Sequence, residues 1–349
     1  MRIRGMQPED LPEASRIWNQ AAEAGEVLFS RADPEYLRRK ILDAPDADPA
    51  LLLAAEAEGQ LAGFICGTAK KNFLPGESAR TSPGFLTCIF VRPEYRRRGL
   101  GSALLARLED AFRTAGRNAA ACSGGNPVNL DWIIPGTPGH DHNNAPGVDE
   151  DCAGYPFLLA AGYTRAVSEV AMYLNLADYC PWDGFAGTRA RLEAEGVRFG
   201  PYDARLGYDY DGMCDRVGSE YWREALRSEI ACQLENRPNT DPRFLPNGRI
   251  PKGPRPLLAA TCDKRIVAQT GPVDVQESGR GFFTGICTDP LYGGRGIGSV
   301  LFNLLMQEFI REGAAFSSLF TGENNHAQKI YLRAGFRPVR RFAIMKKNL

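Results

Sequence analysis

Residues 84–101, GFLTCIFVRPEYRRRGLG, recur 197 positions later as residues 281–298, GFFTGICTDPLYGGRGIG. The match continues without a gap to Gly116 and Gly313, and 14 of the 33 aligned pairs are identical. Average composition would give about two identities over such a length. Because self-similarity at a fixed offset marks a repeated structural unit, the chain is predicted to contain two copies of one domain.

Each copy of this stretch predicts a strand, a glycine-rich turn and a helix. Phe85–Val91 is an apolar run of strand length, and residues 102–116 carry apolar side chains at helical spacing. In the second copy Phe282–Cys287 predicts one long strand, and a helix is predicted from Ser299. The order of elements is therefore the same in both copies.

The repeat also predicts the domain organisation. An N-terminal domain is expected over residues 1–178 and a C-terminal domain over residues 188–349. Proline and glycine interrupt both periodicities at residues 179–187, which predicts a linker there.

Composition excludes several classes of protein. The 349 residues include 42 Lys plus Arg and 42 Asp plus Glu, a formal net charge of zero. This balance argues against a nucleic-acid binder and against attraction to an anionic membrane. No apolar run approaches the roughly 18–20 residues that span a bilayer. The nine cysteines show no CxxC spacing and indicate a reduced, cytoplasmic protein without a disulfide framework.

The glycine-rich turn before a helix is a predicted phosphate-binding feature. Glycines allow close approach of a phosphate to the backbone, and the free N–H groups and dipole of the helix attract an anion. A Walker A loop would need a Lys after its last glycine, whereas Ser102 follows Gly101. A dinucleotide-binding loop would need a third glycine where Leu104 and Leu301 stand. Both nucleotide-binding interpretations fail.

The turn instead resembles the R-x-x-G-x-G signature of the GCN5-related N-acetyltransferase (GNAT) superfamily. Arg96, Gly99 and Gly101 fit it in the first copy, whereas Gly293 replaces the basic or amide residue in the second. The resemblance implies an α/β (α+β) fold of two tandem GNAT domains, each a mixed, mostly antiparallel sheet flanked by helices. The two-domain arrangement is similar to that of mycothiol synthases.

By the same resemblance, the turn and the preceding strand bind acetyl-CoA, the acyl donor. The first copy, with its fuller signature, is expected to bind the donor more tightly. The cofactor-binding residues implied are Ile89, Phe90, Val91, Arg96, Arg97, Arg98, Gly99, Leu100, Gly101, Ser102, Ile286, Cys287, Thr288, Gly294, Arg295, Gly296, Ile297, Gly298, Ser299 and Asn324.

A second family signature, N-x-x-A-x-x-x-Y-x-x-x-G-F, begins at Asn324. The resemblance implies that its Tyr331 is catalytic and protonates the departing thiolate, a role worth about 10²–10⁴-fold in rate for a general acid. The first copy has Leu158 at this position, which carries no proton to donate; Tyr155, one turn earlier, is an alternative, although packing suits it better. The general base is not identified; Glu56, Glu58, Asp263 and Asp274 are candidates by position.

The first copy carries about 24 additional residues around 123–151. His140, Asp141, His142 and Asp149 suggest a metal site, but no predicted helix or strand fixes their geometry, so no metal is expected. The segment is expected to shape the acceptor pocket or an interdomain contact, since Trp132 would otherwise be exposed.

The expected activity is transfer of an acetyl or short acyl group from CoA to a primary amine of a small molecule. Two alternatives stay open: an acetyltransferase for peptide or protein amines, and a regulatory module that binds acyl-CoA without turnover. The sequence does not identify the acceptor, the acyl chain length, the oligomeric state or the number of active copies.

Overall fold

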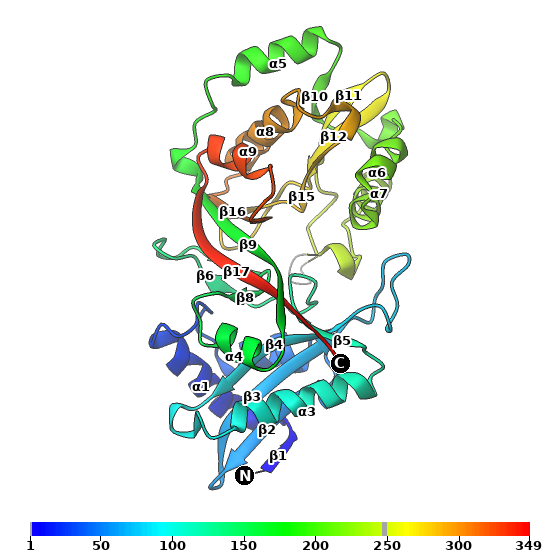
Figure 1. Cartoon of the computed structure of the whole chain (residues 1–349). Helices are drawn as coiled ribbons and strands as arrows, with labels where there is room; N and C mark the ends of the chain where they lie inside the picture. The colour runs from blue at the N-terminus through cyan, green and yellow to red at the C-terminus, as the bar shows by residue number, and fades with distance from the viewer. Residues whose placement is uncertain (1, 246–249) are drawn as a thin grey trace. The chain divides into compact units, whose positions relative to one another are not determined.

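The computed structural model describes residues 2–245 and 250–349, which form two compact units (Figure 1). The first unit comprises Met1–Ala171 together with Arg340–Leu349, and the second comprises Met172–Val339. The mixed α/β architecture with mostly antiparallel strands confirms the predicted fold class. No helix of the described residues is both long enough and apolar enough to cross a bilayer.

The first unit is a sheet with helices on both faces. Its sheet order is β1-β2-β3-β4-β5-β17, antiparallel except where β4 and β5 run parallel, and β8 also pairs with β17. Its elements are β1 (Arg2–Gly5), α1 (Leu11–Glu23), α2 (Pro34–Leu37), β2 (Leu52–Ala57), β3 (Gln60–Ala69), β4 (Gly84–Val91), α3 (Leu100–Thr114), β5 (Ala119–Cys122), β6 (Trp132–Ile133), β7 (Asp141–His142), β8 (Val148–Asp149), α4 (Gly154–Ala160), the start of β9 (Thr164–Asn175) and the end of β17 (Arg337–Asn348).

Two apolar cores lie on opposite faces of this sheet. On one face, Trp18 of α1 packs with Phe64 and Phe90. On the other face, Leu104 and Phe112 of α3 pack against the sheet. The alternation of side chains along each strand sends neighbouring residues to opposite cores, which explains why β3 is buried along nearly its whole length. Figure 1 shows α3 lying along the strands β2–β4.

Strands β4 and β5 separate after a short paired segment. Gly84 and Phe85 pair with Ala120 and Ala121, and no further pairs between the two strands are formed in the described residues. The register between β3 and β4 shifts at Thr87, a β-bulge. A bulge bends its strand and increases the local twist, so Thr87 accounts for the divergence of β4 from β5.

The last strand of the chain completes the first unit. Met345 of β17 is the partner of Cys122 in β5, and Figure 1 shows the C-terminus beside β5. The compact units therefore differ from the predicted domain ranges 1–178 and 188–349 in residues 172–178 and 340–349, because β9 and β17 run across the boundaries between the units. Those ranges stay a prediction for independently folding domains.

The second unit repeats the same architecture. Its four-stranded sheet has the order β10-β11-β12-β15, and β14 pairs with β13 and β16. Its elements are α5 (Phe185–Ala194), β10 (Arg198–Pro201), α6 (Asp211–Val217), α7 (Glu220–Leu234), β11 (Leu258–Cys262), β12 (Arg265–Gly271), β13 (Asp274–Val275), β14 (Arg280–Phe282), β15 (Gly285–Thr288), α8 (Ile297–Arg311), β16 (Phe316–Gly322) and α9 (Gln328–Arg333).

The repeat extends to individual packing contacts. A Cβ on Gly84 would lie 2.3 Å from the Phe112 ring, and a Cβ on Gly281 would lie 2.6 Å from the Phe309 ring. Both pairs are related by the same offset of 197. In each copy an aromatic side chain of the long helix thus occupies the space that a glycine leaves open on the sheet.

Two expectations from the sequence are wrong in detail. The predicted strand Phe282–Cys287 is interrupted after Phe282, because β14 pairs with β16 whereas β15 pairs with β12. The interruption includes Thr284, the counterpart of the bulge residue Thr87. The predicted linker 179–187 also ends too late, since the helix α5 already begins at Phe185.

Candidate active site

A cavity of about 760 Å³ lies in the first unit. It is lined by the loop after α1, by β4, by the turn into α3, by β5, by the additional segment of the first copy, by α4 and by Phe342 of β17. This volume lies within the range of roughly 300–1,000 Å³ that ligand sites occupy. The cavity follows the gap between β4 and β5.

The glycine-rich turn forms one end of this cavity. Gly99, at φ +82°, precedes the first residue of α3, and a Cβ placed on it would meet nothing within 4 Å. Gly101 and Ser102, in the first turn of α3, also line the cavity. The first N–H groups of a helix have no partner inside the helix, so this end of the cavity offers donors to an anion.

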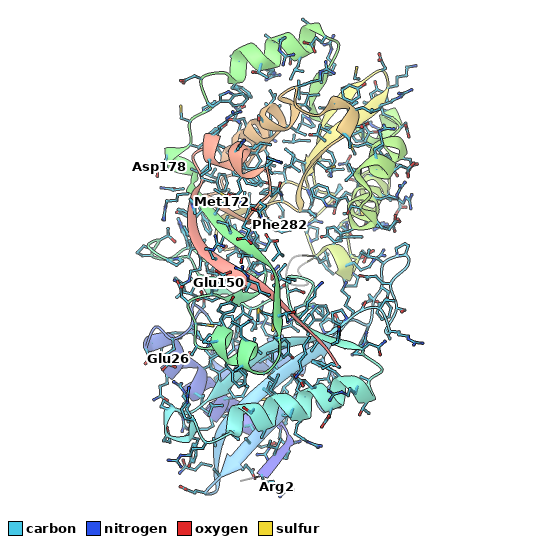
Figure 2. All side chains as sticks on the ribbon, viewed as in Figure 1. Arg2, Glu26, Glu150, Met172, Asp178 and Phe282 are labelled. Carbon is cyan, nitrogen blue, oxygen red and sulfur yellow. The ribbon has the colours of Figure 1, made fainter. Side chains whose placement is uncertain are left out.

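Two arginines of the turn line the cavity, and they differ in backbone conformation and in ion pairing. Arg97 adopts φ +59°, a left-handed conformation that is uncommon for residues other than glycine. Arg96 donates to both carboxylate oxygens of Glu26 at 2.8 and 2.7 Å, and Figure 2 labels Glu26 beyond the end of α1. The hydrogen bonds from Arg96 hold the pKa of Glu26 below its usual value. Of the two guanidinium groups, that of Arg97 forms no ion pair with any residue that the structure describes.

The edge of β4 contributes backbone groups to the cavity. Arg92 donates its N–H to the carbonyl of Ala62 on β3. Because backbone groups alternate in direction along a strand, Ile89 and Val91 direct theirs away from β3, toward the gap. The Val91 carbonyl accepts from Nε of Arg96 at 2.8 Å. An extended ligand with amide groups can pair with this edge.

The turn of the second copy has the same backbone conformation at two positions, but different residues surround it. Gly294 and Gly296 have φ +73° and +94°, at the positions of Arg97 and Gly99. Here α5 packs against the turn: Arg191 donates to the Arg295 carbonyl at 2.7 Å, and a Cβ on Gly296 would lie 2.9 Å from Thr188. Arg295 itself is paired with Glu195. The turn of the first copy is more open at this point.

Residues 14–129 and again residues 221–336 match the family model described as "Acetyltransferase (GNAT) family". The two segments make up more than half of the chain. The chain belongs to the GNAT family. This confirms the resemblance drawn from the glycine-rich turn, and the two matched segments correspond to the two copies.

Curated GNAT relatives match only one part of the chain. An acetyltransferase of Photorhabdus laumondii is 34% identical over 110 residues, which cover 31% of this chain and 64% of the relative. An acetyltransferase of Yersinia pseudotuberculosis is 33% identical over 110 residues, which cover 31% of this chain and 65% of the relative. The match thus spans slightly less than two thirds of each relative.

Solved GNAT structures share the fold over the whole chain. A GCN5-related N-acetyltransferase from Sphaerobacter thermophilus covers 99% of this chain at 16% identity, with a TM-score of 0.59 and 95% of that chain matched. A tandem GNAT protein from the clavulanic acid biosynthesis pathway also covers 99% at 16% identity, with a TM-score of 0.54 and 98% of that chain matched. At these identities the likeness concerns the fold alone.

The predicted donor-binding residues of the first GNAT copy mostly meet at the cavity. Those that line it are Ile89, Phe90, Val91, Arg96, Arg97, Gly99, Gly101 and Ser102. Arg98 and Leu100 are not among the lining residues. Arg98 lies over the Tyr95 ring at 5.9 Å, and Leu100 is buried in the core beneath α3.

The predicted residues of the second GNAT copy gather around the start of α8. Ile286, Cys287 and Thr288 lie on β15, and Gly294, Arg295, Gly296, Ile297, Gly298 and Ser299 form the turn and the first residues of α8. Asn324 precedes α9. Their role in donor binding stays a prediction.

Tyr331 lies on α9 in the core of the second unit. Its side chain is 6% exposed, and its ring packs 5.0 Å from Phe302 and 6.3 Å from Phe336, measured between ring centroids. In the first unit the counterpart Leu158 lines the cavity. The assignment of Tyr331 as the acid stays a prediction, and Tyr155 is not among the lining residues.

Three cysteines line the cavity: Cys88, Cys122 and Cys152. Burial raises the pKa of the Cys122 thiol to about 12 and also raises the pKa of Cys152. The thiols of Cys122 and Cys152 are therefore protonated at neutral pH. The proposed bases Glu56 and Glu58 are not lining residues; Glu56 instead pairs with Arg4.

The additional segment of the first copy helps to build the cavity. Trp132, Gly147 and Asp149 line it, and Trp132 forms an antiparallel bridge with Phe29 after α1. His142 is buried and stacks on Trp132 at 5.6 Å. In the part of the chain that the structure describes, no group of three or more His, Cys, Asp or Glu residues is placed to hold a metal.

Some lining residues come from outside the repeat and were not predicted from the sequence, with the exception of Trp132, whose segment was expected at the acceptor pocket or an interdomain contact. Glu26, Phe29, Trp132 and Phe342 carry no local motif, and tertiary pairing brings them to the cavity. For Phe342 the deciding fact is the register of β17 beside β8, nearly 200 residues away in sequence.

Proposed function

We propose that this GNAT protein is an acetyl-CoA-dependent N-acetyltransferase whose donor binds in the cavity of the first unit. The acetyl group, or a short acyl group, passes to a primary amine of a small molecule. The observation that carries the proposal is the combination, in one cavity, of an open helix N-terminus, the Arg97 side chain and the edge of β4 that, beyond Phe85, pairs with no strand of the described residues on the β5 side.

The three features match the parts of coenzyme A. The pyrophosphate accepts hydrogen bonds from the first N–H groups of α3 and forms an ion pair with the guanidinium of Arg97. The pantetheine arm carries two amides, which pair with the backbone groups of Ile89 and the N–H of Val91 as an added strand would, since the Val91 carbonyl accepts from Arg96. The thioester then lies in the gap opened by the bulge at Thr87.

The reaction is direct transfer without a covalent enzyme intermediate. The amine nitrogen attacks the thioester carbonyl, a C–N bond forms and the C–S bond breaks. The nitrogen loses one proton, and the departing thiolate gains one. Burial raises the pKa of the lining thiols Cys122 and Cys152, which makes them weaker acids than the CoA thiol, and Leu158 carries no acidic proton. The proton that leaves the nitrogen therefore reaches the thiolate through solvent.

The test is release of free CoA thiol from acetyl-CoA with a panel of primary amines. We expect thiol release that depends on both the amine and the protein, together with the acetylated amine in a one-to-one ratio. The variant Arg97→Ala should raise the KM for acetyl-CoA by about tenfold, the effect of one charge-assisted contact. Tight binding of acetyl-CoA with no transfer to any amine would support the binding-module alternative instead.

A further inference from the structure

The cavity of the first unit opens onto both faces of the sheet. Among its lining residues, Leu86 and Leu158 belong to the core beneath α3, whereas Cys88 and Phe90 belong to the core beneath α1. The gap between β4 and β5 connects the two sides. A donor that occupies the α3 side therefore leaves the α1 side for the acceptor.

The α1 side of the cavity is walled by aromatic rings. Phe29 lies 6.3 Å from Phe90, and Trp132 lies 5.1 Å from Phe342, measured between ring centroids. The bridge between Phe29 and Trp132 connects the two pairs. These four rings come from four separate parts of the chain, and all four residues line the cavity.

Few carboxylates line the cavity, and each of them is paired with an arginine. Asp149 is the register partner of Phe342, so the two side chains share a face. Its carboxylate accepts from Nε and Nη2 of Arg340 at 2.8 and 2.9 Å. The other lining carboxylate, Glu26, is paired with Arg96.

We propose that the acceptor is a monoamine that carries an aryl or similarly bulky apolar group, which packs against Phe29, Phe90, Trp132 and Phe342. This inference rests on the proposed function and names the acceptor class for the same site. The apolar group gains burial against the rings, in the range typical of aromatic contacts.

Polycationic acceptors suit this wall poorly. A polyamine or an aminoglycoside carries several ammonium groups, each of which needs a carboxylate or water when it is buried. The lining residues supply two carboxylates, each with an arginine partner. An apolar group requires no such partner.

The experiment compares kcat/KM for 2-phenylethylamine and tryptamine with that for ethylamine and spermidine at saturating acetyl-CoA. We expect the aryl amines to exceed ethylamine and spermidine by about 30-fold or more, the effect of burying one ring. The variants Phe29→Ala and Phe29→Leu should each lower the ratio of 2-phenylethylamine to ethylamine several-fold. Phe73→Ala, at a half-buried phenylalanine outside the cavity lining, is the matched control and should keep the wild-type ratio.

Binding of acetyl-CoA, measured by calorimetry, separates this inference from the proposed function. If acetyl-CoA binds but spermidine or ethylamine is preferred, or if no aryl amine is acetylated, the acceptor class is wrong while the donor site stands. An unchanged ratio in both Phe29 variants would also contradict the proposal that these aromatic rings bind the apolar group of the acceptor. If acetyl-CoA does not bind at all, the proposed function fails and the inference fails with it.

Discussion

The ion pair between Glu26 and Arg96 places a carboxylate beside the donors that we assign to the pyrophosphate. Glu26 accepts two hydrogen bonds from Arg96, and both residues line the cavity. The pair therefore neutralises an arginine that the family signature assigns to the phosphate. A bound pyrophosphate competes with Glu26 for the same guanidinium.

Removing that carboxylate should strengthen donor binding. In Glu26→Gln the side chain keeps its size but loses its charge, so Arg96 becomes available and repulsion of the phosphates decreases. We expect the Kd for CoA to fall about three- to tenfold at low ionic strength, with a smaller effect in high salt. Glu23→Gln, at an exposed residue paired with Arg31, is the control and should leave the Kd unchanged. A weaker affinity for CoA in Glu26→Gln would contradict this role.

The hydroxyl of Tyr331 distinguishes between the two copies as the catalytic centre. With the donor in the first unit, Tyr331→Phe should leave kcat within about twofold, since the ring and its contacts with Phe302 and Phe336 are retained. If kcat instead falls about 100-fold while CoA affinity is unchanged, the acid predicted from the sequence is correct. The catalytic centre would then belong to the second copy.

At the scale of elements, the strand–turn–helix unit was predictable because its signals are local. The apolar run of β4, the glycines of the turn and the helical spacing of α3 all lie within 33 consecutive residues. Most of the predicted donor-binding residues of the first copy therefore do meet at the cavity. Leu100 faces the core instead, because it is the first residue of α3 and lies on the same helix face as Leu104.

Non-local pairing was not predictable from the same signals. Strand propensity does not show which strand will be the neighbour, so neither the break after Phe282 nor the pairing of β17 with β5 could be derived. The helix α5 was assigned partly to a linker because Pro181 and Gly184 precede it. The positions of Phe29 and Phe342 at the cavity depend on such pairings and were not predicted, whereas Trp132 lies in a segment that was expected at the acceptor pocket or an interdomain contact.

The close contact between glycine and aromatic ring makes an element-scale prediction. Gly84→Ala would put a Cβ 2.3 Å from the Phe112 ring and should lower the free energy of unfolding by about 2 kcal/mol or more. Gly187→Ala, in the helix α5 with open space around it, should change stability by at most about 1 kcal/mol, in the stabilising direction. Denaturant unfolding measures both. Equal stability of the two variants would show that the Phe112 ring moves aside for the added methyl group without cost.

At the scale of the molecule, the end of the chain helps to form the cavity of the first unit. Arg340 bonds Asp149 through two hydrogen bonds and also pairs with Asp151 at 2.8 Å, which fixes β17 to the additional segment. Both sides of this contact lie in the first unit. The C-terminal residues of the second copy are therefore part of the structure around the first copy's site.

Breaking this contact should affect stability more than the loss of an exposed ion pair. Arg340→Ala leaves Asp149, whose side chain is 11% exposed, without its partner, and we expect a loss of about 2–3 kcal/mol in the free energy of unfolding. Arg311→Ala, at an exposed pair on α8, should cost less than about 1 kcal/mol. If the two variants unfold at the same denaturant concentration, the contact adds nothing beyond a surface pair.

The proposed donor site lies at the glycine-rich turn of the first unit. Calorimetric titration of CoA into the Gly99→Glu variant tests it most directly, because a carboxylate there opposes the pyrophosphate in otherwise open space. The matched control is Gly116→Glu, which has a similar φ of +74° and equally open surroundings but lies outside the cavity lining. We expect Gly99→Glu to weaken the tighter CoA site at least about 100-fold, whereas Gly116→Glu should bind CoA like the wild type. Unchanged affinity and stoichiometry in Gly99→Glu would contradict it.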